Sequence, residues 1–168
     1  MGILEKAWKI LENILHFIIY KIFYIKLNDD QWKTFIQFVK FGIIGLSNVV
    51  VSYVFYLVFL LVFQKGKIFP NIDYLIAQIL GFALSVLWSF YWNRKCVFDT
   101  DRESVPWLQA LIKTYISYGI TGFGLNTLLS FVWVELLGVS KMIAPIINSL
   151  VSVPINFVLN KFWAFKQK

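Results

Sequence analysis

The sequence has few of the residues that build cross-linked or reactive sites. Its 168 residues include one cysteine, Cys96, and one histidine, so neither an internal disulfide nor an ordinary zinc site is expected. No Gly-rich phosphate loop, nucleotide-binding region or clustered acid/base pair is recognisable. We therefore expect no metal, no cofactor and no enzymatic activity such as sugar transfer.

Charge is also scarce, at 15% of residues, where a soluble domain has about a quarter. The deficit is concentrated in four runs that contain no charged residue: Phe41–Phe63, Tyr74–Trp92, Thr114–Val134 and Met142–Leu159. A helix needs about 20 residues to cross a bilayer, and backbone polar groups must be paired in lipid. The sequence therefore predicts an all-α membrane protein with four transmembrane helices, at about residues 38–63, 72–93, 112–136 and 141–161 of a membrane domain that covers 29–168.

The positive charges lie mainly on one side of these predicted helices. The N-terminal segment, the second loop and the C-terminus hold 13 of the 16 Lys and Arg residues. Because cations favour the cytoplasmic side, both termini are predicted to be cytoplasmic, in a plasma membrane. The net charge of +7 then faces anionic lipid or another phosphate-bearing partner; we expect no nucleic-acid partner.

Residues 1–28 precede the predicted membrane domain and have a different pattern. Apolar residues from Ile3 to Ile18 recur at helical spacing, and Glu5, Lys6 and Lys9 fall on the other face. This pattern predicts an amphipathic helix in the membrane interface. The sequence LNDDQ at 27–31 then supplies the capping residues and acids typical of a new helix start.

The two halves of the membrane domain resemble each other. At an offset of 67 residues, SFYWNRKCVF at 89–98 aligns with NFVLNKFWAF at 156–165. At an offset of 77, FGIIG at 41–45 corresponds to YGITG at 118–122, so the first predicted external loop holds ten extra residues. Each half has an even number of predicted helices, so the halves are predicted to be parallel two-helix repeats. Small or polar residues recur every four positions in both: Ala77, Gly81, Ser85, Ser89 and Asn93, and Ala144, Asn148, Ser152, Asn156 and Asn160. Such spacing predicts a close helix-packing face.

Asparagines within the apolar runs have two interpretations. They could hydrogen-bond between helices, worth about 0.6 kcal/mol each on average, or they could line a polar groove. Cations at the predicted cytoplasmic ends could bind phosphate. Tryptophans at similar depth could form an aromatic belt or stack on a sugar.

The motifs FVKFGIIGLSN, SFYWNRKCVF, YGITGFGLN and NFVLNKFWAF resemble the GtrA-like family of small four-span membrane proteins, over about residues 35–166. The resemblance implies a role in building bacterial surface polysaccharide or in teichoic-acid glycosylation. That role is to flip a polyprenyl-phosphate-linked sugar from the cytoplasmic to the outer leaflet, alongside membrane glycosyltransferases. Asn93, Arg94, Asn160 and Lys161 occupy the family's motif positions. The enclosed volume of four helices is small, so we also expect a homo-oligomer.

The combined prediction assigns two sets of residues. Phosphate-binding candidates are Arg94, Lys95, Lys113 and Lys161. Candidates for the groove and for sugar contacts are Asn48, Asn93, Asn126, Asn148, Asn156, Asn160, Trp88 and Trp92. The acids within the predicted spans are Asp73 and Glu135, and both lie at the external edges. The absence of a carboxylate deeper in the membrane argues against a proton-coupled multidrug transporter. A non-transporting partner that recruits or stabilises a glycosyltransferase remains the alternative.

Overall fold

The structure is a computed structural model that describes residues 2–98, 106–140 and 143–166. These residues form helices and no strand. Three helices are long and apolar enough to cross a membrane, Asp29–Gly66, Asp73–Cys96 and Trp107–Leu136. The predicted class, an all-helical membrane protein, is therefore confirmed. The chain divides into two compact units, Met1–Val39 and Lys40–Lys168, and the division falls within the helix that begins at Asp29.

The first unit holds helix α1 (Ile3–Phe17), the π-helix η1 (Ile18–Ile22) and the start of α2 (Asp29–Gly66). The exposed side chains Ile10, Ile14 and Phe17 lie along one side of α1, as expected for an amphipathic helix. The interfacial position of α1 stays a prediction.

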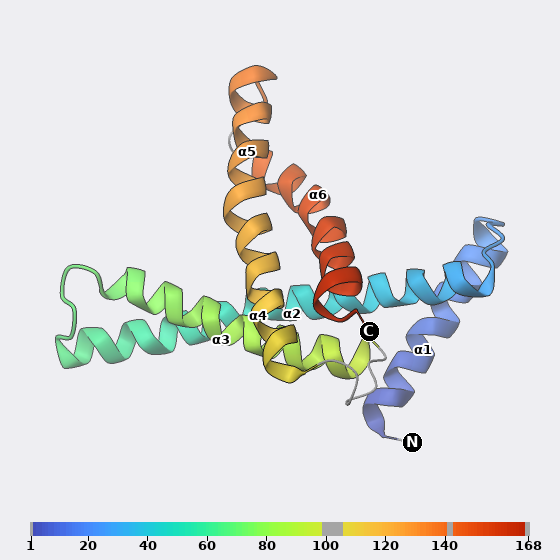
Figure 1. Ribbon diagram of the computed structural model, residues 1–168, viewed down its shortest axis with the longest axis horizontal. Helices are drawn as coiled ribbons and strands as arrows, with labels where there is room; N and C mark the ends of the chain where they lie inside the picture. Colours follow the sequence, from blue (N-terminus) through green and yellow to red (C-terminus); the bar gives the residue numbers. More distant parts are fainter. Residues whose placement is uncertain (1, 99–105, 141–142, 167–168) are drawn as a thin grey trace. The chain divides into compact units, whose positions relative to one another are not determined.

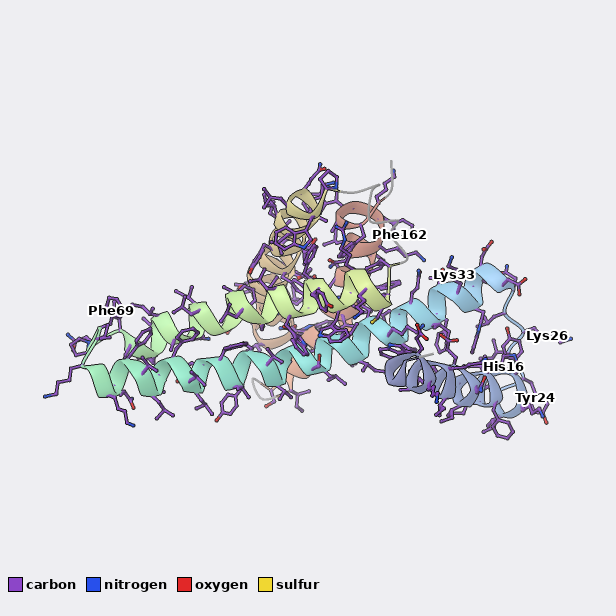
Figure 2. The ribbon with its side chains drawn as sticks, turned by 90° about the horizontal axis from the view of Figure 1, so that it is seen from below. His16, Tyr24, Lys26, Lys33, Phe69 and Phe162 are labelled. Carbon is purple, nitrogen blue, oxygen red and sulfur yellow. The ribbon has the colours of Figure 1, made fainter. Side chains whose placement is uncertain are left out.

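Aromatic contacts and a helix cap join the elements of this unit. The rings of His16, labelled in Figure 2, and Tyr20 stack at 4.3 Å between centroids, and Tyr20 lies 5.6 Å from the ring of Trp32 on α2. The backbone N–H of Gln31 donates to Asn28 Oδ1 at 2.8 Å, and the Asn28 N–H donates to Gln31 Oε1 at 3.0 Å. This reciprocal cap satisfies two orphan donors and confirms the helix start predicted from LNDDQ.

In the second unit, α2 and α3 (Asp73–Cys96) form a hairpin, and both views draw them side by side (Figures 1 and 2). Phe69 lies in the connecting turn, where its ring meets that of Phe63 at 5.7 Å. Gly81 lets the two backbones approach closely, since a Cβ at this position would lie 2.9 Å from the Ser52 carbonyl oxygen.

A second hairpin follows. Its first arm is a continuous run of helix made of α4 (Trp107–Gly119), η2 (Ile120–Leu125), α5 (Asn126–Phe131) and η3 (Val132–Leu136). Gly138, at φ 66°, permits the left-handed turn after it. The second arm, α6 (Ala144–Leu159), runs directly into η4 (Asn160–Ala164) and packs against α5. Residues 141–142, where the fourth predicted span begins, lie outside the described residues.

The small-residue stripes are buried in the helix contacts, as predicted. On α3, Ala77, Ser85, Ser89 and Asn93 are at most 1% exposed, and Gly81 is buried with them. On the second arm of the other hairpin, the buried members of the stripe are Ala144, Asn148, Ser152 and Asn160. Asn156, the fifth member, is partly exposed.

An aromatic cluster joins the two hairpins where α3 and η4 end. We use this name for five buried phenylalanines, Phe41, Phe90, Phe98, Phe157 and Phe165. The Phe98 and Phe165 rings stack at 4.7 Å with an interplanar angle of 22°, and the Phe41 ring meets that of Phe157 at 5.6 Å. These contacts bring the part of α2 around Phe41 together with the ends of α3 and η4, which carry Arg94 and Lys161. We call this region the basic end below.

Candidate functional site

Three of the four predicted phosphate-binding cations lie over aromatic rings at the basic end. Lys95 Nζ is 5.3 Å from the ring centroid of Trp92, and Lys161 Nζ is 5.7 Å from that of Phe157. Lys113 Nζ, on α4, donates to the Trp163 carbonyl oxygen at 3.1 Å and lies 5.8 Å from the ring of the same residue. A cation over a ring keeps an outer face for an anion, so this arrangement suits a phosphate.

Arg94, the fourth candidate, lies in the last turn of α3 and is partly exposed. Its helix end carries Phe90 and Phe98, whose rings both contact Phe165 beyond η4. Lys161 lies in η4, which is only five residues long. The aromatic cluster therefore joins the two helix ends that carry Arg94 and Lys161.

The asparagines of the second hairpin form a ladder of hydrogen bonds between its arms. Ser152 Oγ donates to Asn126 Oδ1 at 2.6 Å, and Thr121 Oγ1 donates to Asn156 Oδ1 at 2.7 Å. Asn148 Nδ2 donates to Ser130 Oγ at 2.7 Å and to the Asn126 carbonyl oxygen at 3.2 Å. We call these contacts the amide ladder; they match the interhelical-bonding interpretation of these residues.

Two motif asparagines end the stripes at the basic end. Asn160, fully buried, accepts from Thr114 Oγ1 at 3.3 Å and donates to the Asn156 carbonyl oxygen at 2.8 Å. Asn93, 1% exposed, donates to Ser89 Oγ at 3.0 Å. Ser89 Oγ in turn lies 3.0 Å from the hydroxyl oxygen of Tyr118. This chain of bonds connects the two hairpins through α3 and α4.

Asn48 lies apart from the ladder, in a cavity of about 550 Å³ between α2 and α3. The polar residues around the cavity are Asn48, Ser52, Tyr53, Tyr56, Gln78 and Ser85. Asn48 Oδ1 is shielded from solvent and has no hydrogen-bond partner in the part of the chain that the structure describes. The predicted groove residues thus fall into two groups, one per hairpin, and their ligand-binding role stays a prediction.

Trp88 and Trp92 lie on α3, as do the cavity residues Gln78 and Ser85, but nearer the basic end. Trp88 Nε1 donates to Ser47 Oγ at 3.1 Å, and the two indole rings contact each other at 5.6 Å. The Trp88 contact ties α3 to α2 one residue before Asn48. A sugar-stacking role for either ring stays a prediction.

Sequence reasoning missed Ser52, Tyr53, Tyr56 and Gln78 as cavity residues. One signal was present, because Asn48 and Ser52 are four residues apart and so share a helix face. The same holds for Gln78 and Ser85, which are seven apart. Which two faces meet depends on how α2 and α3 are paired, and this pairing cannot be read from one sequence.

Comparison with known proteins places residues 40–165 within the family described as GtrA/DPMS, transmembrane domain. The uncharacterized membrane protein YwcD of Bacillus subtilis is 25% identical over 97 residues, which cover 58% of this chain and 76% of YwcD. The cell wall teichoic acid glycosylation protein GtcA of Listeria monocytogenes is 24% identical over 98 residues, covering 58% of this chain and 68% of GtcA. The family match covers α2 from Lys40 onward and all of the helices that follow it.

Proposed function

Because the chain belongs to the GtrA/DPMS transmembrane-domain family, we propose that it moves a polyprenyl-phosphate-linked monosaccharide from the cytoplasmic to the outer leaflet of a bacterial membrane. There the sugar would serve membrane glycosyltransferases that decorate teichoic acid or another surface polysaccharide. The relatives named for teichoic acid glycosylation support this assignment. The protein itself would perform no bond-making chemistry.

The proposal includes four membrane-spanning helices with both termini in the cytoplasm, so that the basic end faces the cytoplasm. The fourth helix would be α6 continued by η4, of 16 and 5 residues. The two hairpins would be parallel repeats. Ring contacts support this arrangement. At an offset of 67 residues, Phe98 is equivalent to Phe165, and these two rings contact each other. Phe90 is likewise equivalent to Phe157, and the Phe90–Phe165 contact at 5.6 Å corresponds to the Phe98–Phe157 contact at 6.0 Å.

One observation carries the transport proposal. Cations lie at one end of the helices, and the otherwise apolar segments of the same helices carry polar side chains. A phosphate needs positive charge near it, because an isolated charge in the bilayer is costly. Arg94, Lys113 and Lys161 would hold the phosphate at the basic end. The polyprenyl tail would stay in lipid, and only the sugar would need polar contacts.

The amide ladder offers a route that can be opened at low cost. Each of its bonds is worth about 0.6 kcal/mol on average in a membrane. Sugar hydroxyls both donate and accept hydrogen bonds, so they can replace the bonds between Thr121 and Asn156 and between Ser152 and Asn126 in turn. The helices would then separate while their polar groups stay paired.

Reconstitution tests the proposal directly. Liposomes that contain only this protein and radiolabelled polyprenyl-phosphate glucose would receive periodate from outside, which oxidises exposed sugar diols. We expect oxidation of the inner-leaflet sugar as well as the outer, whereas empty liposomes should lose only the outer-leaflet share. If both preparations lose the same share, the chain does not translocate the lipid.

Two substitutions, each with a matched control, test whether the named residues carry the transport. Arg94→Ala should abolish transport by removing a phosphate contact, and Lys65→Ala, at the other end of α2, should not. Asn126→Ala and Ser152→Ala both remove the 2.6 Å bond between these two residues, so they cost similar stability. Only Asn126→Ala should abolish transport, since it removes the amide itself; equal effects would reduce Asn126 to a structural role.

The amide ladder also favours a second candidate function. Because the asparagines of the second hairpin already bond to the neighbouring arm, they stabilise a closed helix pair without any ligand. A closed pair suits a partner that recruits or stabilises a glycosyltransferase. This function predicts no transport in the liposomes and loss of glycosyltransferase from the membrane fraction when the gene is deleted.

A further inference from the structure

The cavity between α2 and α3 lies in the middle of the first hairpin rather than at the basic end. Ser52 is near the centre of the uncharged run Phe41–Phe63, and Gln78 and Ser85 come from the facing run of α3. The volume of about 550 Å³ is within the range of small-molecule sites. Polar side chains at this depth need a polar partner.

The close approach at Gly81 shapes this cavity. Ser52 and Tyr56, which line the cavity, are also the residues whose backbone atoms lie within about 3 Å of a Cβ built at Gly81. The helices therefore touch at this point, and the side chains around the contact line an open hollow beside it. At the equivalent position of the second hairpin, Asn148 carries a side chain that reaches Ser130.

The lining has no charged residue and combines polar side chains with the apolar Val49 and Phe82. It offers the amides of Asn48 and Gln78, the hydroxyls of Ser52 and Ser85 and two tyrosines. Asn48 Oδ1 is an acceptor hidden from solvent and left without a partner among the described residues. Leaving such a group unpaired costs about 1–3 kcal/mol, which a hydroxyl donor would recover once the Asn48 amide turned its oxygen toward the cavity.

We propose that this cavity binds the sugar of the lipid-linked substrate near mid-membrane, and that it selects an uncharged hexose over a uronic acid or amino sugar. The selection follows because a charged substituent would be buried without an opposite charge in the lining. Neutral hydroxyls, by contrast, match the amides and serines. This inference rests on the proposed function and adds to it a location and a substrate class.

Binding measurements test the inference apart from transport. The purified full chain in detergent would be titrated, by microscale thermophoresis, with farnesyl phosphate and with its glucosyl, glucuronyl and amino-sugar derivatives. We expect the glucosyl probe to bind roughly tenfold more tightly than farnesyl phosphate, corresponding to about two net hydrogen bonds. The charged-sugar probes should gain nothing over farnesyl phosphate.

Paired variants locate the site. Asn48→Leu and Gln78→Leu should each weaken binding of the glucosyl probe by roughly 3- to 10-fold, the loss of one hydrogen bond, and leave farnesyl phosphate binding unchanged. The matched controls Asn71→Leu and Gln64→Leu change the same residue types at exposed positions outside the cavity. These controls should bind both probes like the original chain.

Several outcomes would overturn the inference. Equal affinity for farnesyl phosphate and its glucosyl derivative excludes a sugar site, and preserved discrimination in Asn48→Leu and Gln78→Leu places the sugar elsewhere. A changed oligomeric state of Asn48→Leu in mass photometry, with sugar selectivity intact, means that a second copy fills the cavity. Each result leaves the transport proposal standing if liposome transport persists. If the chain binds the glucosyl probe more tightly than farnesyl phosphate but shows no transport in liposomes, the sugar site is supported and the transport proposal is rejected.

Discussion

Gly81→Ala is the sharpest test of the first hairpin. The added methyl carbon would lie 2.9 Å from the Ser52 carbonyl oxygen and 3.0 Å from the Tyr56 backbone nitrogen, whereas ordinary contacts begin at 3.4 Å. Both obstacles are backbone atoms, so α2 must move away by about 0.5 Å. Overpacking of this kind costs about 1–3 kcal/mol, and the gain in helix propensity returns about 0.5–1 kcal/mol. We expect a net loss of about 1 to 2 kcal/mol.

Gly45→Ala is the matched control, because it lies in α2 and a Cβ there meets nothing within 4 Å. It should gain the same helix propensity without a clash, so the difference between the two variants isolates the overpacking, about 1–3 kcal/mol. Unfolding in mixed micelles by increasing SDS, followed by far-UV circular dichroism, measures both free energies. Equal stability of the variants, within about 0.5 kcal/mol, would refute the close approach of α2 and α3.

Three further predictions use other contacts. Thr121→Val removes the 2.7 Å bond to Asn156 Oδ1 and should cost about 0.6 kcal/mol in the same unfolding assay; a loss above about 2 kcal/mol would mean that the ladder is far stronger than a membrane average. In a double-mutant cycle, Phe98→Leu and Phe165→Leu should be coupled by about 0.5–1.5 kcal/mol because their rings stack, and purely additive losses would contradict the stack. Asn28→Ala should cost the start of α2 about 1 kcal/mol, seen as faster amide exchange in its first turn; unchanged exchange would contradict the cap.

Local and periodic features could be predicted from the sequence. The uncharged runs marked the long helices, LNDDQ marked the cap at Asn28, and four-residue spacing identified the buried stripe from Ala77 to Asn93. These features follow from helix geometry and from chemistry within a few residues along the chain. No knowledge of the partner helix was needed for them.

The cavity and the partners of each amide could not be predicted in this way. An asparagine facing a neighbouring helix and one facing a groove give the same sequence pattern, so Asn126 and Asn48 looked equivalent. Their difference arises from the partner surface: Ser152 faces Asn126, whereas the close contact at Gly81 leaves space near Asn48. Similarly, the rings beneath Lys113 and Lys161 depend on the path of η4.

The first hairpin has Gly81 where the second has Asn148 at the equivalent position, and this difference has an evolutionary consequence. If one ancestral hairpin was duplicated, the stacking of Phe98 on Phe165 preserves what was first a self-association of identical subunits. In a symmetric homodimer every substitution occurs in both subunits. The two halves of a fused chain can instead diverge, because each has its own sequence. One half could then keep the close helix approach that its glycine permits, with the cavity beside it. The other half could acquire an amide that hydrogen-bonds its own two arms together.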